Sequence, residues 1–383
     1  MENIKFSKKK TKALFLNLSV LFPLILNNSF LSQIIIISFF CVTALCYGNF
    51  NLNISKLIFL ILILFSIVLN SSQIEFKNAM RLTQLTLGFM VFPLLINTEN
   101  LNINYIRFGI VYVAVLTVLD ILNLPIFFLY RDAFYPTDAN PWALGFDHSI
   151  IALSNRYGSI FYNPNLLGQS MLLIYILYLI YNYQKKFTKM DYLIVFLNTF
   201  CILVSGSRTA FVIYAIVTFC FFFHFYKGKI KYFFILAGIP YALYSLSNTR
   251  LLKIGNESGD SMDLKMQILY SYFSSLSFTI QDTFLLLFGS LKLDIQFDND
   301  LGNIIYYLGL MGLLYVICFY TYEIFTTNWR LRYFYSFLLV SYGATLLINF
   351  KFFIFAIIIF SFLRSLSKNL KKQKAAVPDT QMI

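Results

Sequence analysis

The sequence predicts an all-α membrane protein, a polytopic bundle of about 12 transmembrane helices that forms a single domain over residues 1–383. Two observations support this fold class: 59% of the residues are hydrophobic and only 12% are charged. A soluble domain has about a quarter of its residues charged and about half or fewer apolar. Because one span needs about 20 mostly apolar residues, this composition suffices for roughly ten to twelve spans and leaves little for a soluble core.

Apolar runs of suitable length recur along the chain. We expect spans, with boundaries uncertain by several residues, at 13–30, 31–48, 56–71, 83–97, 105–126, 164–183, 190–205, 209–226, 230–247, 301–322, 332–348 and 351–365. The basic start, Met1 to Lys12, is followed by no cleavage pattern of small residues, so we expect an uncleaved cytoplasmic tail. The five cysteines lie in apolar runs without CxxC spacing, which disfavours disulfides and zinc sites.

The basic residues orient the spans. The chain has 30 Lys and Arg against 17 Asp and Glu, an excess that in a soluble protein would suggest nucleic acid. With a cytoplasmic start, 20 of the 30 basic residues fall on the inner side, although the outer loops are longer. The positive-inside rule therefore predicts both termini in the cytoplasm, and no nucleic-acid partner is expected. The basic tail, residues 366–383, is expected to lie near anionic lipids of the inner leaflet.

Two long loops are expected on the outer face, at about 127–163 and 248–300. Long polar loops joined by rigid helices are where binding and catalysis tend to occur. In the second loop, apolar residues repeat at helical spacing from Leu264 to Leu276, with polar residues such as Lys265 between them. This pattern predicts an amphipathic helix that lies on the outer leaflet or packs on the bundle.

Three polar clusters stand where the chain re-enters the membrane from outside: Asn163-Pro164-Asn165, Ser207-Arg208-Thr209 and Asp298-Asn299-Asp300. Each helix N-terminus leaves about four N–H groups unpaired and carries a partial positive charge. Two interpretations remain open. The polar residues cap their helices, or the helix starts converge on one face and bind an anion.

Arg208 is the strongest element of the anion hypothesis. An arginine beside two apolar runs is costly and cannot lose its proton, so an anion should compensate it, and a phosphate matches its planar donor fork. The alternatives are an ion pair with an outer carboxylate such as Asp298, or extension toward the lipid headgroups. Arg156 and Arg250 are further outer cations that either assist or are surface charges.

Other catalytic patterns are scarce. His148, in the first long loop, is a candidate base, although a single loop histidine is more often uninvolved. Asp120, near the outer end of the fifth span, is a candidate because a carboxylate inside the membrane is expensive; its alternative role is a hydrogen bond to Asn123 or to a neighbouring helix. The sequence contains no HExxH, GxSxG or P-loop pattern, and no metal or cofactor is expected.

The order of these motifs resembles that of a known family. The segments Arg156–Asn165 (RYGSIFYNPN), Ser205–Ala210 (SGSRTA) and Asp298–Leu313 resemble signatures of the superfamily of O-antigen polymerases and O-antigen ligases, which are membrane glycosyltransferases. The resemblance covers most of the chain from about Arg156 to Tyr320 and implies a fold like that of the ligases, of the GT-C type. Ligases of this superfamily carry a histidine at the end of the large outer loop, where this chain has Asp298-Asn299. The resemblance therefore favours a polymerase.

The resemblance also implies substrates and roles. The donor would be a growing glycan on undecaprenyl pyrophosphate, the acceptor a single lipid-linked repeat, and the site the outer face of a bacterial inner membrane. Membrane lipids and a chain-length regulator protein would be the other partners. Asp298 or Asp300 would be the base, with His148 as a third candidate. The residues expected at the pyrophosphate are Arg208, Arg156, Arg250, Ser207, Asn163, Asn165, Asn299 and Lys265. Two rivals stay open: a ligase that transfers polymer to a lipid A core, and a flippase or transporter without chemistry.

Overall fold

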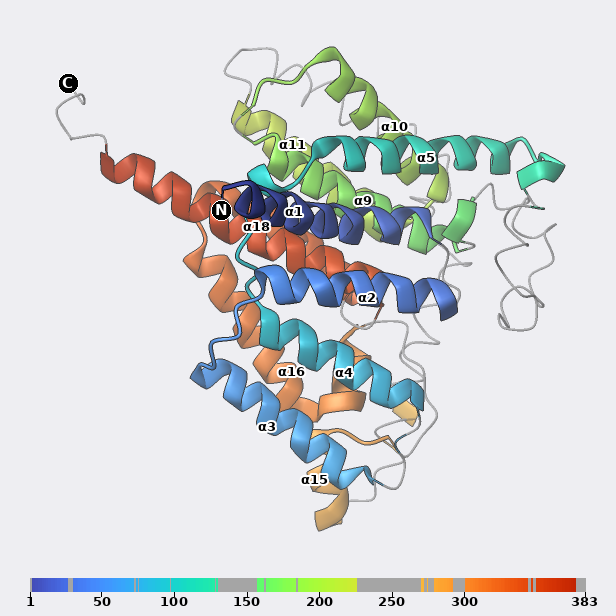
Figure 1. Ribbon diagram of the computed structural model, residues 1–383. Helices are drawn as coiled ribbons and strands as arrows, with labels where there is room; N and C mark the ends of the chain where they lie inside the picture. Colours follow the sequence, from blue (N-terminus) through green and yellow to red (C-terminus); the bar gives the residue numbers. More distant parts are fainter. Residues whose placement is uncertain are drawn as a thin grey trace. The chain divides into compact units, whose positions relative to one another are not determined.

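The structure is a computed structural model, and the chain divides into two compact units. The structure describes residues 2–26, 30–71, 76–96, 98–127, 157–161, 163–183, 185–225, 279–291, 300–343 and 349–376, with single positions 74, 129, 270, 271, 274 and 346. Every regular element in these residues is a helix, which confirms the all-α prediction (Figure 1). The first unit comprises Met1–Cys46 and Asn97–Lys253, the second Tyr47–Ile96 and Ile254–Ile383. The single domain expected over residues 1–383 stays a prediction.

Four described helices are long and apolar enough to cross a membrane. They are α5 (Ile103–Ile121), α9 (Pro164–Tyr181), α16 (Asp300–Thr326) and, within α18 (Phe350–Ala376), the segment Lys351–Gln373. Three further helices are apolar as well but shorter, at Ser32–Tyr47, Ile54–Leu69 and Arg208–His224. The expected span at 230–247 lies outside the described residues, and the number of about 12 spans stays a prediction.

In the first unit, α9 occupies the centre. It contacts α5, α10 (Lys189–Ser205) and α11 (Arg208–Phe225), and every residue from Leu167 to Ile180 is buried. A helix that is apolar on all sides is stable only where neighbours surround it, so the sequence of α9 accounts for this position. The other elements of this unit are α1 (Glu2–Ile25), α2 (Phe30–Tyr47), η2 (Thr98–Asn100) and η4 (Ser159–Phe161).

In the second unit, α16 contacts α3 (Ile54–Leu69), α15 (Ile280–Phe288), η6 (Trp329–Leu339) and α17 (Val340–Gly343). The remaining pair is α18 and α4 (Phe76–Val91), which contact each other. The middle of α18, from Phe352 to Leu363, is almost wholly buried. The helices of this unit therefore pack around α16 and α18.

The helix α16 is broken at Gly309, where the sequence predicts an uninterrupted span at 301–322. Gly309 has φ 67° and ψ −169°, a conformation that only glycine adopts readily. A Cβ atom at Gly309 would overlap the backbone of Leu287 and Phe288, and one at Gly289 would overlap the backbone of Tyr307. The two glycines thus let the end of α15 and the break in α16 approach each other at backbone distance.

The expected α-helical span at 332–348 is instead mostly a 3₁₀-helix, η6, followed by the short α17. Its buried residues explain the difference. Leu331, Phe334, Phe337 and Val340 recur every third position, and each has 0% exposed surface. A helix with about 3.0 residues per turn aligns every third residue on one face, whereas an α-helix with 3.6 would rotate them away from each other. Burial of this aromatic and aliphatic stripe therefore favours the tighter helix.

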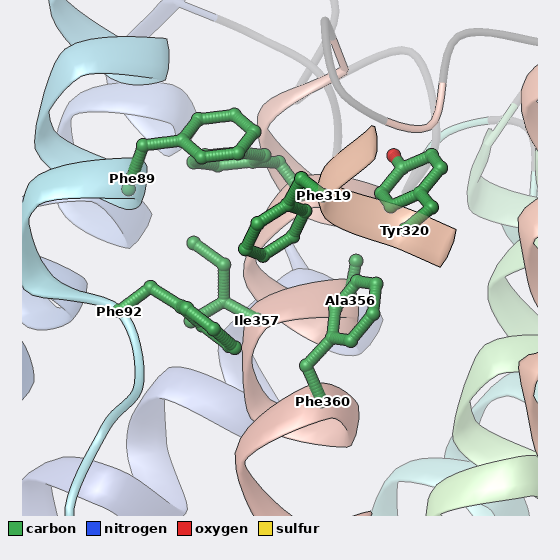
Figure 2. Close-up of a pocket in the computed structure, with 9 residues that line it drawn as sticks. Phe89, Phe92, Phe319, Tyr320, Ala356, Ile357 and Phe360 are labelled. Atoms are coloured by element: carbon green, nitrogen blue, oxygen red, sulfur yellow. The ribbon is translucent and has the colours of Figure 1, made fainter. Parts of the chain in front are cut away.

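Aromatic rings fill the space between α4, α16 and α18 (Figure 2). Phe89 and Phe92 meet Phe319 edge to face at centroid distances of 5.3 and 5.2 Å, and Phe319 meets Phe360 at 5.9 Å. The rings surround an apolar cavity of about 20 Å³, which is the size of a single water molecule. A space of this size is too small for a substrate.

Candidate functional site

The start of α9 forms one side of the candidate site. Asn163 is the N-cap: its side chain accepts a hydrogen bond of 2.8 Å from the backbone N–H of Asn165, and Pro164 occupies the first turn. This confirms the capping interpretation of Asn163. Both asparagines are exposed, because the cap leaves their side chains at the surface of the first unit. They remain accessible to a ligand while the cap fixes the direction of α9.

The turn between α10 and α11 forms the other side. Gly206 ends α10 in the left-handed conformation, with φ 60° and ψ 20°, which glycine adopts without strain. Ser205 Oγ accepts a hydrogen bond of 3.2 Å from the N–H of Ser207, and the Ser207 carbonyl accepts the first helical bond of α11 from Phe211, at 3.0 Å. Ser207 is buried. Arg208 is then the first residue of α11 and is partly exposed.

These two helix starts lie side by side. A Cβ atom added to Gly168, in the second turn of α9, would lie 2.5 Å from Ser205 Oγ and 2.7 Å from Ser207 Cβ. The backbone N–H of Tyr157 also donates to the carbonyl of Val204 at 3.3 Å, which joins the segment before α9 to the last turn of α10. Two of the three polar clusters predicted to converge therefore do so within the first unit. A small residue at position 168 is what permits this approach, and the sequence analysis did not single it out.

Asp120 supports the same region from α5. Its Oδ2 accepts a hydrogen bond of 2.9 Å from the backbone N–H of Ser159, in the short helix η4. Ser159 has φ 50°, which is unusual for a residue other than glycine, and Asp120 holds it there. The alternative role expected for Asp120, a hydrogen bond to a neighbouring helix, is what the structure contains.

Three buried polar atoms near these helix starts have no hydrogen-bond partner within the described part of the chain. They are Ser159 Oγ, Gln169 Oε1 and Ser170 Oγ, on residues that are 1%, 2% and 0% exposed. Gln169 follows Gly168 directly, and Ser159 belongs to the segment that precedes α9. Buried polar atoms are nearly always paired in proteins, so such atoms mark positions where a partner from outside the chain would be favourable.

The other predicted site residues belong to the second unit or lie outside the described residues. Asp300 is the first residue of α16, in the second unit, and has 0% exposed surface. Six other positions lie outside the described residues: His148, Arg156, Arg250, Lys265, Asp298 and Asn299. The amphipathic segment expected at Leu264–Leu276 is described only at Tyr270, Ser271 and Ser274, which are all exposed. Among the described residues, no group of three His, Cys, Asp or Glu is arranged to hold a metal ion.

Sequence reasoning missed a further polar cluster, in the second unit. Arg81 of α4 donates a hydrogen bond of 3.0 Å from Nη1 to the Tyr307 hydroxyl, which donates in turn to Asn78 Oδ1 at 3.0 Å. The signal was present, because Arg81 stands beside an apolar run just as Arg208 does. What the sequence does not reveal is Tyr307, which lies 226 positions away along the chain.

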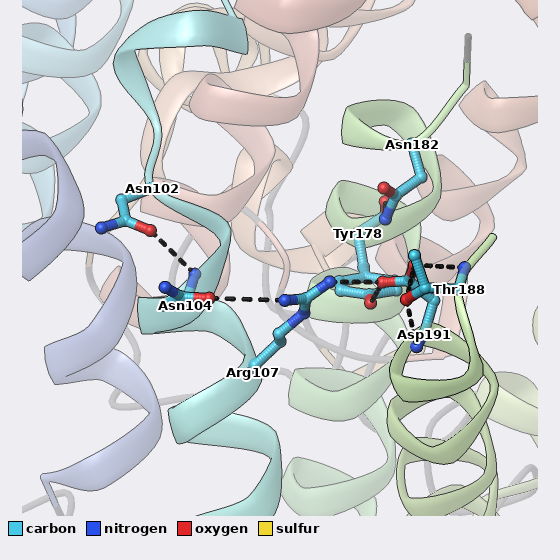
Figure 3. A network of polar contacts seen from close by, with 7 residues as sticks. All are labelled: Asn102, Asn104, Arg107, Tyr178, Asn182, Thr188 and Asp191. Carbon is cyan, nitrogen blue, oxygen red and sulfur yellow. Dashed lines mark hydrogen bonds and ion pairs between the residues drawn. The ribbon is translucent and has the colours of Figure 1, made fainter. Parts of the chain in front are cut away.

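The opposite ends of α5, α9 and α10 carry a polar network (Figure 3). Arg107 Nη2 lies 2.7 Å from Asp191 Oδ1, and the Tyr178 hydroxyl donates to the same oxygen. Asp191 Oδ2 accepts from the backbone N–H and the hydroxyl of Thr188, at 2.8 and 2.7 Å, which closes a capping box at the start of α10. The ion pair of Arg107 with Asp191 and the hydroxyl of Tyr178 join the three helices whose other ends form the candidate site, although Arg107 Nε has no hydrogen-bond partner among the described residues.

The apolar helices define the class to which this chain belongs: it is a helical membrane protein. Neither protein-family models nor curated proteins of known function match its sequence.

Proposed function

We propose that the protein polymerises lipid-linked oligosaccharide repeats on the outer face of a bacterial inner membrane, by glycosyl transfer with inversion. The observation that carries this proposal is the meeting of two helix starts at Gly168, Ser205 and Ser207, with Arg208 at the first position of α11. Helix N-termini and an arginine are suited to stabilise the charge that develops on a departing pyrophosphate. The proposed fold is a bundle of about 12 spans of the GT-C type.

In this reaction the acceptor hydroxyl attacks the anomeric carbon of the donor glycan. The bond from that carbon to the pyrophosphate breaks, and undecaprenyl pyrophosphate leaves with the negative charge. A base takes the proton of the attacking hydroxyl. Asp298 is the preferred base over Asp300, because Asp300 has no exposed surface, and over His148. Arg208 binds the leaving pyrophosphate, with Arg156 and Arg250 assisting.

The test is the substitution Arg208→Lys. Lysine keeps the positive charge but loses the planar donor fork that binds two phosphate oxygens, so polymer synthesis should fall by about tenfold or more. The measurement is the ladder of O-polysaccharide lengths in cells that carry each variant in place of the native protein, with an immunoblot for membrane level. Arg208→Ala should be inactive and still accumulate. Arg330→Lys is a matched control, because Arg330 is exposed in η6 and should tolerate the change. A full-length ladder from Arg208→Lys contradicts the pyrophosphate role.

The break in α16 favours a second candidate, a flippase or transporter of lipid-linked oligosaccharides. Gly309 lies nine residues into α16, about 14 Å along a helix and so near the middle of a bilayer, where transporters place broken helices. A deletion strain separates the candidates by its lipopolysaccharide. Lipid A core bearing one repeat indicates a polymerase, and bare core with single repeats left on the inner face indicates a flippase. Bare core with polymer stored on the carrier lipid indicates a ligase.

A further inference from the structure

Arg81 is held by Tyr307, a neutral side chain of the second unit, which is itself bound to Asn78. Its Nη1 donates to the Tyr307 hydroxyl at 3.0 Å, and the guanidinium carbon lies 6.0 Å from the centre of the Tyr307 ring. The Tyr307 hydroxyl donates a hydrogen bond of 3.0 Å to Asn78 Oδ1, one helical turn before Arg81 on α4. The phenol therefore accepts from the arginine and donates to the asparagine, so its orientation is fixed.

The positive charge of Arg81 is not neutralised by this cluster. Within the described part of the chain, no carboxylate forms an ion pair with it. Arg81 is partly buried, about one and a half turns into α4, and its guanidinium keeps its proton under all ordinary conditions. One of its five N–H donors is bound to Tyr307. A charge at this position is costly without an anion, and no described residue binds the other donors, which can therefore bind one.

The acceptor that orients Arg81 is itself rigid. Tyr307 is 1% exposed, its carbonyl accepts a hydrogen bond from Ser66 Oγ of α3, and the break at Gly309 follows two residues later. The segment that packs against this break is held by Asn70, which donates to the Gly289 carbonyl at 3.1 Å and accepts from the N–H of Leu291 at 2.9 Å. A cation fixed in advance by a hydrogen bond to a buried tyrosine binds a ligand without the cost of ordering a mobile side chain.

We propose that Arg81, positioned by Tyr307 and Asn78, binds the diphosphate of a second lipid-linked substrate. This inference rests on the proposed function, because joining two lipid-linked glycans requires two carrier lipids and each carries a diphosphate. Arg208 serves one of them from the first unit, and Arg81 serves the other from the second. In the predicted orientation α4 starts at the outer face, where both headgroups must lie.

The experiment counts bound carrier lipids on the full-length protein. The probe is undecaprenyl pyrophosphate without sugar, added to the protein in phosphatidylcholine nanodiscs, and native mass spectrometry reports the number bound. The wild type should bind two. Arg81→Gln should lose one by raising its dissociation constant about 10- to 100-fold, which is the size expected for charge-assisted hydrogen bonds. Arg208→Gln should lose the other, and the double variant should lose both. Arg330→Gln, which removes an exposed arginine, should still bind two.

The outcomes separate this inference from the proposed function. If Arg81→Gln binds two lipids with unchanged affinity, Arg81 has no role in diphosphate binding and the inference is overturned. The proposed function still stands in that case if Arg208→Gln loses one bound lipid. If the wild type binds no probe, the proposed function fails as well. A phosphodiester headgroup is the other source of the same chemistry. If phosphatidylglycerol in the nanodisc displaces the probe from the Arg81 site at equal concentration, the site binds bulk lipid and the substrate assignment is wrong.

Two further measurements serve as controls for the folding of the variants. The melting temperature of each variant in detergent shows whether a loss of binding reflects a loss of structure. Arg81→Lys keeps the charge and the approximate length but not the fork, so it should fold as the wild type does and still weaken probe binding at one site by about tenfold. If Arg81→Lys and the wild type bind undecaprenyl pyrophosphate with equal affinity, Arg81 does not bind a diphosphate through two parallel hydrogen bonds, and the inference is wrong.

Discussion

Arg107 and Arg81 are two arginines in apolar helices, and each contacts a cluster that contains a tyrosine hydroxyl. Arg107 is paired with Asp191 at 2.7 Å, and Tyr178 and Thr188 satisfy the remaining bonds of that carboxylate. Among the described residues, Arg81 contacts the neutral Tyr307 and, through it, Asn78. In the first cluster a carboxylate of the chain neutralises the arginine, although the buried Nε of Arg107 has no hydrogen-bond partner in the described residues. In the second cluster the arginine has no counterion in the described residues.

This difference separates a structural arginine from a ligand-binding one. Removing one partner of a buried ion pair costs stability, because the other charge is left uncompensated. An arginine without a counterion in the described part of the chain, such as Arg81, adds little to stability there. Its burial costs free energy, which the binding of an anion would offset. Changes around Arg107 should therefore alter folding, and changes at Arg81 should alter binding.

The largest effect is expected from Gly309→Ala, which breaks the scaffold of the Arg81 cluster. Alanine would force a strained backbone conformation, at about 1–3 kcal/mol, and its Cβ would overlap the backbone of Leu287 and Phe288, at about 1–3 kcal/mol more. The free energy of unfolding in detergent should fall by about 4 kcal/mol. The control is Leu310→Ala at the next position, whose side chain is 36% exposed, and which should lose about 1 kcal/mol or less. Equal losses in the two variants would contradict the close backbone approach.

The second effect is expected from Asp191→Ala, which breaks the Arg107 cluster. Removing the carboxylate leaves Arg107 unpaired beside Tyr178, and we expect a loss of about 3 kcal/mol in the free energy of unfolding. Thr188→Ala removes the helix cap but leaves the ion pair intact, so it should cost about 1 kcal/mol. Undecaprenyl pyrophosphate binding by the protein that remains folded should be unchanged in both. A similar small loss in both variants would mean that the ion pair adds nothing to the cap.

The smallest effect is expected from a matched pair, Tyr178→Phe and Tyr307→Phe. Each substitution removes one hydroxyl that contacts an arginine cluster and keeps the ring, so each should lower the free energy of unfolding by about 1–2 kcal/mol. Only Tyr307→Phe should also weaken undecaprenyl pyrophosphate binding, by about threefold to tenfold, because it frees Arg81 from its fixed position. Equal affinities in the two variants would remove the distinction between the clusters.

The sequence was sufficient for the features that depend on neighbouring residues. The start of α9 at Pro164, with Asn163 as its cap, follows from local helix-capping preferences, and the apolar runs predict the helices that carry the site. It was insufficient where distant segments decide. Gly309 stands between two leucines, and a single glycine is tolerated in a membrane helix, so only the approach of α15 reveals the break. Similarly, the neighbourhood of Gly168 becomes informative only once α9 and the turn at Gly206 are seen together.

The 3₁₀-helix η6 has a consequence for how this segment can change in length. Its buried stripe, which ends at Val340 directly after η6, repeats every three residues from Leu331. The same face is therefore kept only when the segment changes in length by a multiple of three residues. Deleting three residues would shorten it by about 6 Å and leave the stripe on one face. Deleting one residue would turn every later side chain by a third of a turn and expose half of the stripe. Length variation in relatives of this protein should therefore occur in threes at this position.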